Sequence, residues 1–403
     1  MSLRMIRDVL KARDVSKHCA LCGRPFARFP FDEEHIFPTW LQHRHNLWTR
    51  KLNIPNFIDK RYDSVKLVIC QRCNNKTYGS LETRLAPVFS GPDPFTAAAQ
   101  LDDDVLAVWL GKIFWLLIRK SHSVVDFRSR DLPEQDRIVP NDVLPGTLYL
   151  GMIQRAFATG KGMMSCYARD LNFPEFFYGE PYSLYRFRID LRDSRFEAFD
   201  FFDNPITLGV GFRTSTLGII CLFDGGLHQR FRSPAWEFLA GQALHPVQFA
   251  EVAARMFYDS TVLDEDAMRV TYYWNKKLNA VISQCHTPRN YDPYLAEKHD
   301  AARLAAFIGH HTLNDPAQIL QPDGRTVSCL RDENGGFLPF AVTMKTFKPR
   351  AQTLTESYSV PWTRIGARRP AEVKANPEGF RIHPPGPLGL PNTNLFQLNF
   401  GLD

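Results

Sequence analysis

The sequence has no apolar run long enough to cross a membrane. Its most apolar stretch, residues 105–118, is interrupted by Lys112 and is shorter than the ~20 residues that a bilayer requires. Residues 1–17 carry charges throughout and lack the apolar centre of a secretion signal, so we expect a cytoplasmic protein without a membrane partner. The chain also lacks internal repeats, a glycine-rich phosphate loop and a Gly-x-Ser-x-Gly elbow. Nucleotide-binding and serine-hydrolase functions therefore have no support from these motifs.

The composition is that of a globular protein with an uneven distribution of charge. The 403 residues are 44% hydrophobic and 23% charged, which predicts two or three folded domains. Residues 1–86 contain 16 basic and 8 acidic side chains, whereas the remainder contains 33 basic and 35 acidic ones. A basic segment on a near-neutral body indicates a local site for a polyanion such as nucleic acid.

Four of the eight cysteines form two CxxC pairs inside this basic segment, Cys19/Cys22 and Cys70/Cys73. Two thiolates at this spacing can bind one side of a tetrahedral ion, and a second pair completes the site. In a chain without a secretion signal the pattern favours structural zinc over disulfides, with four reduced, buried cysteines as the alternative. The other cysteines share no spacing, and we expect them to be buried: Cys166, Cys221, Cys285 and Cys329.

The segment between and after the pairs predicts two short strands and a helix. We expect one strand to carry Glu34 and His35, a second at residues 65–69, and a helix that begins at Asn74 as its cap and ends at Pro87. Strand alternation would point Glu34 and His35 to opposite sides unless the strand ends or bulges there.

This arrangement resembles the HNH endonucleases, whose ββα-metal core is often clasped by a CxxC…CxxC zinc site. The resemblance covers residues 17–88 and rests on CALCG at 19–23, EHIFP at 34–38 and CQRCNNK at 70–76. It implies that His35 is the general base and that Glu34 and Asn74 hold a catalytic Mg²⁺ or Mn²⁺, with 5′-phosphate and 3′-hydroxyl products. The histidine and the oxygen ligands suit those roles.

Two positions in this comparison stay open. Glu33 competes with Glu34 as the metal-binding acid. The middle Asn of the family has no obvious counterpart, and its candidate replacements are Asp63, Ser64, Asn46, Asn53 and Asn56.

The insert at residues 40–51 mixes basic and aromatic side chains, as nucleic-acid contacts do. We expect phosphate contacts from Arg44, Arg50, Lys51 and Lys76. By the resemblance, double-stranded DNA is the expected partner.

Beyond residue 90 the sequence predicts an α+β region with an antiparallel sheet. Residues 105–118 predict a buried helix, and residues 185–191 alternate as a half-buried strand whose arginines we expect to face solvent. Residues 196–202 and 206–223 predict its partner strands, and residues 246–258 and 294–308 predict helices, the second closing at Gly309.

We therefore expect an α+β protein with a zinc-clasped ββα (treble-clef-like) nuclease domain at 1–90, a β-rich region at 91–240, a helical region at 241–345 and a Pro-rich tail at 346–403. The expected function is that of a metal-dependent endonuclease, in bacterial antiviral defence or a mobile element. The alternatives are a non-catalytic zinc module for nucleic acid or protein, and an RNA-directed nuclease. Residues 125–403 give no mechanism and are open to a protein partner.

Overall fold

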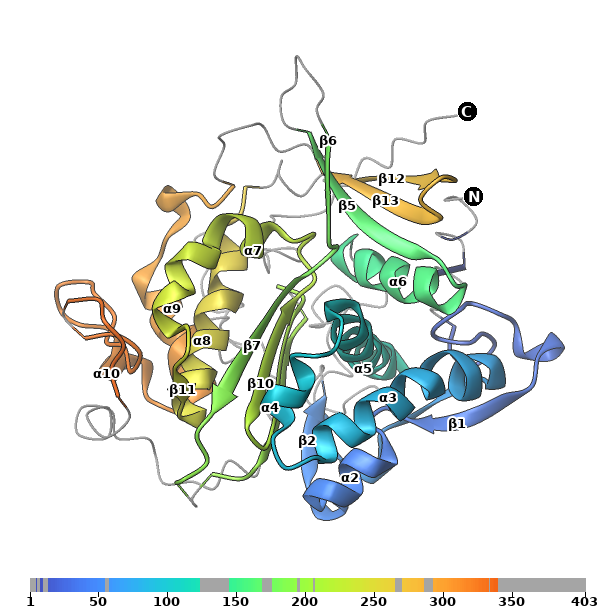
Figure 1. Cartoon of the computed structure of the whole chain (residues 1–403), viewed down its shortest axis with the longest axis horizontal. Coiled ribbons are helices and arrows are strands. Elements are labelled where there is room, and N and C mark those ends of the chain that lie inside the picture. The colour runs from blue at the N-terminus through green and yellow to red at the C-terminus, as the bar shows by residue number, and fades with distance from the viewer. Residues whose placement is uncertain are drawn as a thin grey trace, which may run out of the picture.

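The computed structural model describes residues 5, 8–9, 14–54, 58–123, 145–168, 176–193, 196–205, 207–264, 270–285, 293–332 and 334–339. It has a mixed α+β fold with antiparallel and mixed sheets (Figure 1), which confirms the predicted class at that level. The expected tail at 346–403 lies outside the described residues. Within the described residues, no helix is both long and apolar enough to span a bilayer.

The N-terminal unit is built on a two-stranded sheet followed by a helix. Strand β1 (Phe31–His35) pairs antiparallel with β4 (Lys66–Cys70), so that Phe31 lies opposite Cys70 and His35 lies opposite Lys66. The connection between them contains a helix and a hairpin, α2 (Thr39–His45), β2 (Lys51–Ile54) and β3 (Ile58–Arg61). After β4 the chain continues through the π-helix η4 (Arg72–Tyr78) into α3 (Gly79–Ser90).

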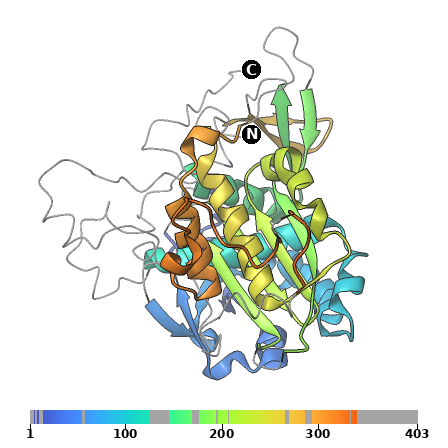
Figure 2. The same ribbon diagram turned by 90° about the vertical axis from the view of Figure 1, so that its left-hand side faces the viewer.

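A five-stranded sheet forms the centre of the larger region. Its strand order is β11-β7-β10-β9-β8, and every pair is antiparallel except β11 with β7. The strands are β7 (Ser183–Ile189), β8 (Phe199–Asn204), β9 (Gly209–Thr214), β10 (Leu217–Leu222) and β11 (Ala243–Leu244). Two helices, α8 (Pro246–Asp259) and α9 (Ala301–Thr312), lie on one side of this sheet (Figure 2). The prediction of an antiparallel β-rich core is confirmed in these strands.

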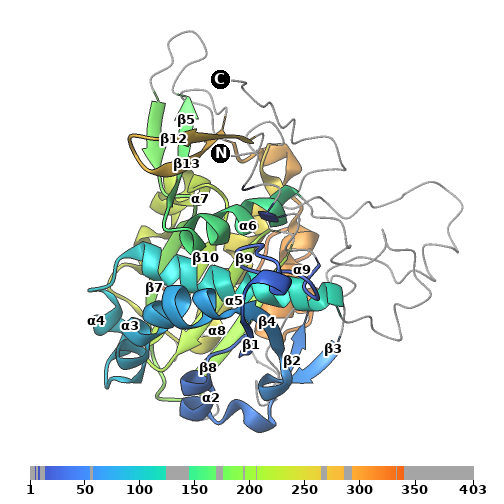
Figure 3. The ribbon, with the colours of Figure 1, turned by 90° about the vertical axis from the view of Figure 1, so that its right-hand side faces the viewer.

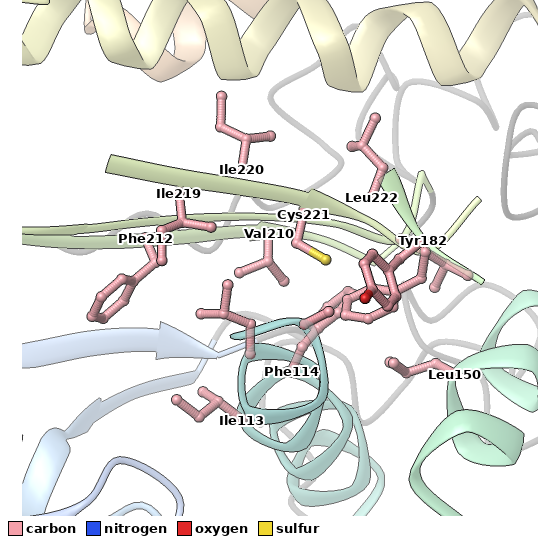
Figure 4. Packing of buried hydrophobic residues seen from close by; sticks show 14 of the residues in the cluster. Ile113, Phe114, Leu150, Tyr182, Val210, Phe212, Ile219, Ile220, Cys221 and Leu222 are labelled. Atoms are coloured by element: carbon pink, nitrogen blue, oxygen red, sulfur yellow. The ribbon is translucent and has the colours of Figure 1, made fainter. Parts of the chain in front are cut away.

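Helix α5 (Asp103–Ser123) lies between the five-stranded sheet and the N-terminal unit (Figure 3). All residues from 105 to 118 are buried, as the apolar pattern predicts. In Figure 4, Ile113 and Phe114 of α5 face the side of the sheet that carries Phe212 and Cys221, whereas Ile220 points to the opposite side. This alternation lets one sheet bury both faces, one against α5 and one against α8.

A second sheet of four strands lies beyond α6 (Pro145–Ala158), at the top of Figure 1. Its order is β12-β13-β5-β6, with strands β5 (Gly162–Ala168), β6 (Phe176–Gly179), β12 (Val270–Asn275) and β13 (Ala280–Cys285). The remaining short helices are α4 (Pro94–Ala98), α7 (Leu227–Arg232) and α10 (Pro316–Ile319).

One hydrophobic cluster joins the N-terminal unit to the sheet and its helices. It contains Cys19 and Leu85 from the first 90 residues, Trp109 from α5, and Leu330 near the end of the described chain. The domain boundaries at 90, 240 and 345 stay predictions. Members of this one cluster lie on both sides of residues 90 and 240.

Arg192, just beyond β7, is solvated as predicted, with its side chain 91% exposed, whereas the two arginines inside β7 form ion pairs with the helices. Arg186 forms an ion pair with Asp103 and donates to the Leu101 carbonyl, while Arg188 pairs with Asp93 at 3.3 Å. Asp93 caps α4 and Asp103 opens α5, so these ion pairs fix two helix starts against the sheet edge.

The predicted limits of two helices are wrong. Asn74 is not a cap but lies inside η4, and α3 continues past Pro87 to Ser90 because the fully buried Phe89 packs on Trp109. Helix α9 begins after its cap Asp300, rather than at residue 294, and runs three residues past Gly309. In both cases tertiary packing and a side-chain cap outweigh local breaker signals.

Candidate metal centre and nucleic-acid site

The four cysteines of the two CxxC pairs converge in the structure. Their sulfur atoms all lie within 4.8 Å of one another, and the Cys22 and Cys70 sulfurs are 3.5 Å apart. Tetrahedral zinc–thiolate bonds of ~2.3 Å place sulfurs about 3.8 Å from each other, so the cluster fits such an ion. These buried cysteines can hold a metal ion such as zinc, and among the described residues they are the one such group of Cys, His, Asp and Glu ligands.

Local backbone geometry shapes the first CxxC turn. The Cys19 amide donates to the Arg24 carbonyl at 2.9 Å, and Gly23 closes the turn with a φ of +66°. A Cβ atom at Gly23 would lie 2.3 Å from the Asp8 carbonyl oxygen. Only glycine therefore fits this turn without moving the preceding chain.

The second CxxC turn forms where β4 passes into η4. Cys70 is the last residue of β4 and Cys73 lies in the π-helix. The Gly79 amide donates to the Asn74 carbonyl, and a Cβ atom at Gly79 would lie 2.8 Å from that oxygen. The π-turn thus depends on the small residue that follows it.

The surroundings of the cluster favour a bound cation. Burial raises the pKa of the Cys19 thiol well above its usual range. Four buried sulfurs at this separation can become thiolates together only if a positive ion balances them. The first turn is also fixed to the core, because Trp115 of α5 donates its indole N–H to the Ala20 carbonyl at 2.7 Å.

The two-stranded sheet of β1 and β4 has two chemically different faces. Pairing and alternation place Phe31, Glu33 and His35 on one face, where Lys66 lies directly opposite His35 and its Nζ is 3.3 Å from Glu33 Oε2. Glu34 is on the other face, beside Leu67, which is buried against the helices. Glu34 and His35 are therefore held on opposite faces, as strand alternation predicts.

A buried lysine holds Glu34. Lys112 Nζ of α5 is 2.9 Å from Glu34 Oε1 and 2.7 Å from Glu82 Oε1 of α3, and the lysine side chain is only 1% exposed. Burial alone would lower the pKa of Lys112, but Glu82 and Glu34 outweigh it and hold that pKa above its usual value. Burial raises the pKa of Glu82, against the opposing effect of Lys112.

Sequence reasoning did not foresee this acid–lysine–acid cluster. Its one signal is a single charged residue inside the otherwise apolar stretch at 105–118. A lone lysine in a fully buried helix needs an anionic partner, although the sequence does not show which acids supply it.

His35 has the protonation properties of a base. It is half-buried, and burial together with the nearby Lys66 ammonium lowers its pKa below the usual value. The imidazole is therefore neutral near pH 7 and able to accept a proton. A divalent ion shared by Glu34 and Asn74 beside His35 stays a prediction.

The four candidate phosphate contacts have different surroundings. Arg44 donates to the Ser90 carbonyl at 2.9 Å and to Ser215 Oγ at 3.3 Å. Arg50 forms an ion pair with Glu197. Lys51 and Lys76 are exposed. The two arginines thus help to join the insert to the rest of the fold, and all four nucleic-acid roles stay predictions.

No protein-family model matches this chain, and no curated protein or solved structure matches it either.

Proposed function

We propose that this protein is a zinc-stabilised, metal-dependent endonuclease of the HNH type. The observation that carries the proposal is the convergence of the four cysteines beside the paired strands β1 and β4 and the helix that follows β4. His35, a histidine of lowered pKa, lies at the end of β1. Zinc is the metal that best suits four thiolates in a tetrahedral cluster. Nucleic acid is the substrate that suits the basic first 86 residues.

The residues divide the work of phosphodiester hydrolysis. His35 accepts a proton from the attacking water. Glu34 and Asn74 would hold a Mg²⁺ or Mn²⁺ ion, which supplies charge neutralisation at the phosphorus. Because Lys112 already occupies Glu34 Oε1, only the second carboxylate oxygen of Glu34 is left for that role. Glu33 is the alternative acid, since it shares the face of His35.

The Glu34–Lys112–Glu82 contact favours a second candidate function. The Lys112 ammonium lies 2.9 Å from the Glu34 carboxylate and neutralises its negative charge, as a divalent cation would. The same ammonium repels a divalent cation. A zinc module that binds nucleic acid or protein without cutting it would have this arrangement. Metal-dependent cleavage separates the two functions.

The test is a cleavage assay on purified protein whose zinc content has been measured by elemental analysis. Supercoiled plasmid, single-stranded DNA and RNA are incubated with Mg²⁺ or Mn²⁺ and without either ion. We expect cleavage that needs the divalent ion and falls ~100-fold or more in His35→Ala, while nucleic-acid binding is kept.

His299→Gln is the matched control, because His299 is exposed just before α9, outside the unit that carries the candidate site. It should cut like the unaltered protein. One zinc per chain with no divalent-dependent cleavage would establish the binding module instead. Full activity of His35→Ala would show that another group is the base.

A further inference from the structure

Two phenylalanines at the start of β1, where Phe31 pairs with Cys70, are unusually exposed. Phe31 is 51% and Phe29 is 37% exposed. Large hydrophobic side chains this open are few among the described residues, and the other two are Tyr178 in β6 and Leu278 in the turn between β12 and β13. An apolar ring left in water at such a position indicates a contact with a partner.

Arginines surround these rings. The Arg24 guanidinium lies 4.9 Å from the centre of the Phe29 ring, and Arg28 is exposed one residue before it. The backbone N–H of Gln71 donates to the Pro30 carbonyl at 3.0 Å, and Arg72, the next residue, is also exposed close to the start of β1. We name this surface the knuckle patch and define it by Arg24, Phe26, Arg28, Phe29, Phe31 and Arg72.

From the knuckle patch, strand β1 leads to His35. Phe31, Glu33 and His35 occupy alternate positions of β1 and so share one face. At ~3.3 Å per residue the backbone positions of Phe31 and His35 are about 13 Å apart. The Phe31 ring is itself braced by Phe26, with ring centres 4.8 Å apart. The surface therefore presents a fixed aromatic ring at one end and the candidate base at the other.

We propose that the knuckle patch binds an unpaired strand of nucleic acid, with bases stacked on Phe29 and Phe31 and phosphates on the arginines. Exposed aromatic rings bind the faces of bases, and a duplex hides those faces inside its own stack. Guanidinium groups complement the phosphates of such a strand. The inference deepens the proposed nuclease function and rests on it for the role of His35, because it makes an unpaired strand the substrate that reaches that residue.

Binding of a fluorescent 20-nucleotide single strand, measured by anisotropy without Mg²⁺ or Mn²⁺, tests the proposal separately from cleavage. We expect the single strand to bind more tightly than the same sequence as a duplex. Phe31→Ala should raise the Kd about 5- to 150-fold, the range for loss of one stacked base. Phe31→Trp should restore tight binding, and Arg28→Gln should reduce the slope of log K against log salt by about 0.7.

Tyr178→Ala is the control, since it removes an equally exposed ring from β6. Zinc content and melting temperature confirm that each variant is folded.

Equal binding by Phe31→Ala and the unaltered protein, or preference for the duplex, overturns the inference. Loss of binding in Phe31→Ala upholds it even if the unaltered protein never cuts. Normal binding by Phe31→Ala with intact cleavage would leave the nuclease proposal standing and remove the knuckle patch from it. Labelled DNA and RNA strands, used side by side, show which sugar is preferred.

Discussion

Replacing Lys112 by methionine tests how much the buried acid–lysine–acid cluster stabilises the fold. Methionine keeps most of the side-chain volume but leaves Glu34 and Glu82 without the ammonium that lies within 3 Å of each. Removing one partner from a buried ion pair costs ~3–5 kcal/mol, because the remaining charge is desolvated and uncompensated. An unfolding entropy of about 2.1 cal/mol/K per residue over 403 residues converts this to a fall in Tm of about 4–6 °C.

The pH dependence of that loss gives a sharper readout. In the variant the pKa of Glu82, already raised by burial, rises further because Lys112 no longer opposes that shift. A carboxyl whose folded-state pKa lies above its unfolded value loses stability as the pH rises through the folded-state pKa. The Tm deficit of Lys112→Met should therefore be larger at pH 8 than at pH 5, as measured by calorimetry at both values.

Two further variants make the reasoning refutable. Lys112→Met/Glu82→Gln should recover part of the deficit, since it removes one of the two uncompensated charges. Lys277→Met, in the exposed turn between β12 and β13, should leave Tm unchanged. A Tm of Lys112→Met within 1 °C of the unaltered protein at both pH values would show that the cluster contributes nothing to stability.

Two other buried groups predict opposite responses to pH. Burial lowers the pKa of His45 to about 3, so its neutral form is favoured and the stability of the fold should decrease as the pH drops from about 6.5 towards 3. His45→Gln can still form the hydrogen bond to Thr214 Oγ1, and it should reduce this loss of stability in acid unfolding curves. Burial raises the pKa of Asp203 to about 8, so the protein should lose stability as the pH rises from about 4 to 8 and this carboxyl ionises. Asp203→Asn should therefore melt at a higher temperature than the unaltered protein at pH 8.5 but not at pH 5. Unchanged curves for either variant would contradict the burial that each assignment assumes.

The sequence was informative wherever spacing alone determines the outcome. Cys19, Cys22, Cys70 and Cys73 repeat one short ligand pattern, and the apolar stretch at 105–118 admits only a buried helix. The turn residues at 203–205 likewise predict the end of β8, whereas the break between β9 and β10 inside residues 206–223 was not predicted, because both strands are buried on both faces and do not alternate. Local periodicity carries this information, so no knowledge of distant contacts is needed.

Contacts between distant segments could not be read from the sequence. Lys112 meets acids that lie 78 and 30 residues away, and Arg186 and Arg188 of β7 meet acids at the starts of α5 and α4. Nothing in the local pattern distinguishes such an arginine from a solvated one. The π-turn at Asn74 was also missed, because its hydrogen bond to Gly79 depends on how Cys70 and Cys73 orient the chain.

Helix α5 joins the N-terminal unit to the five-stranded sheet. Its Trp115 contacts the first CxxC turn, its Lys112 contacts Glu34 of β1, and its far side packs on β9 and β10. A fragment that ends at residue 90 would lack both contacts and would expose the core side chains that α5 now covers. Through Lys112 and Glu34, this one helix connects the five-stranded sheet to the strand that carries His35.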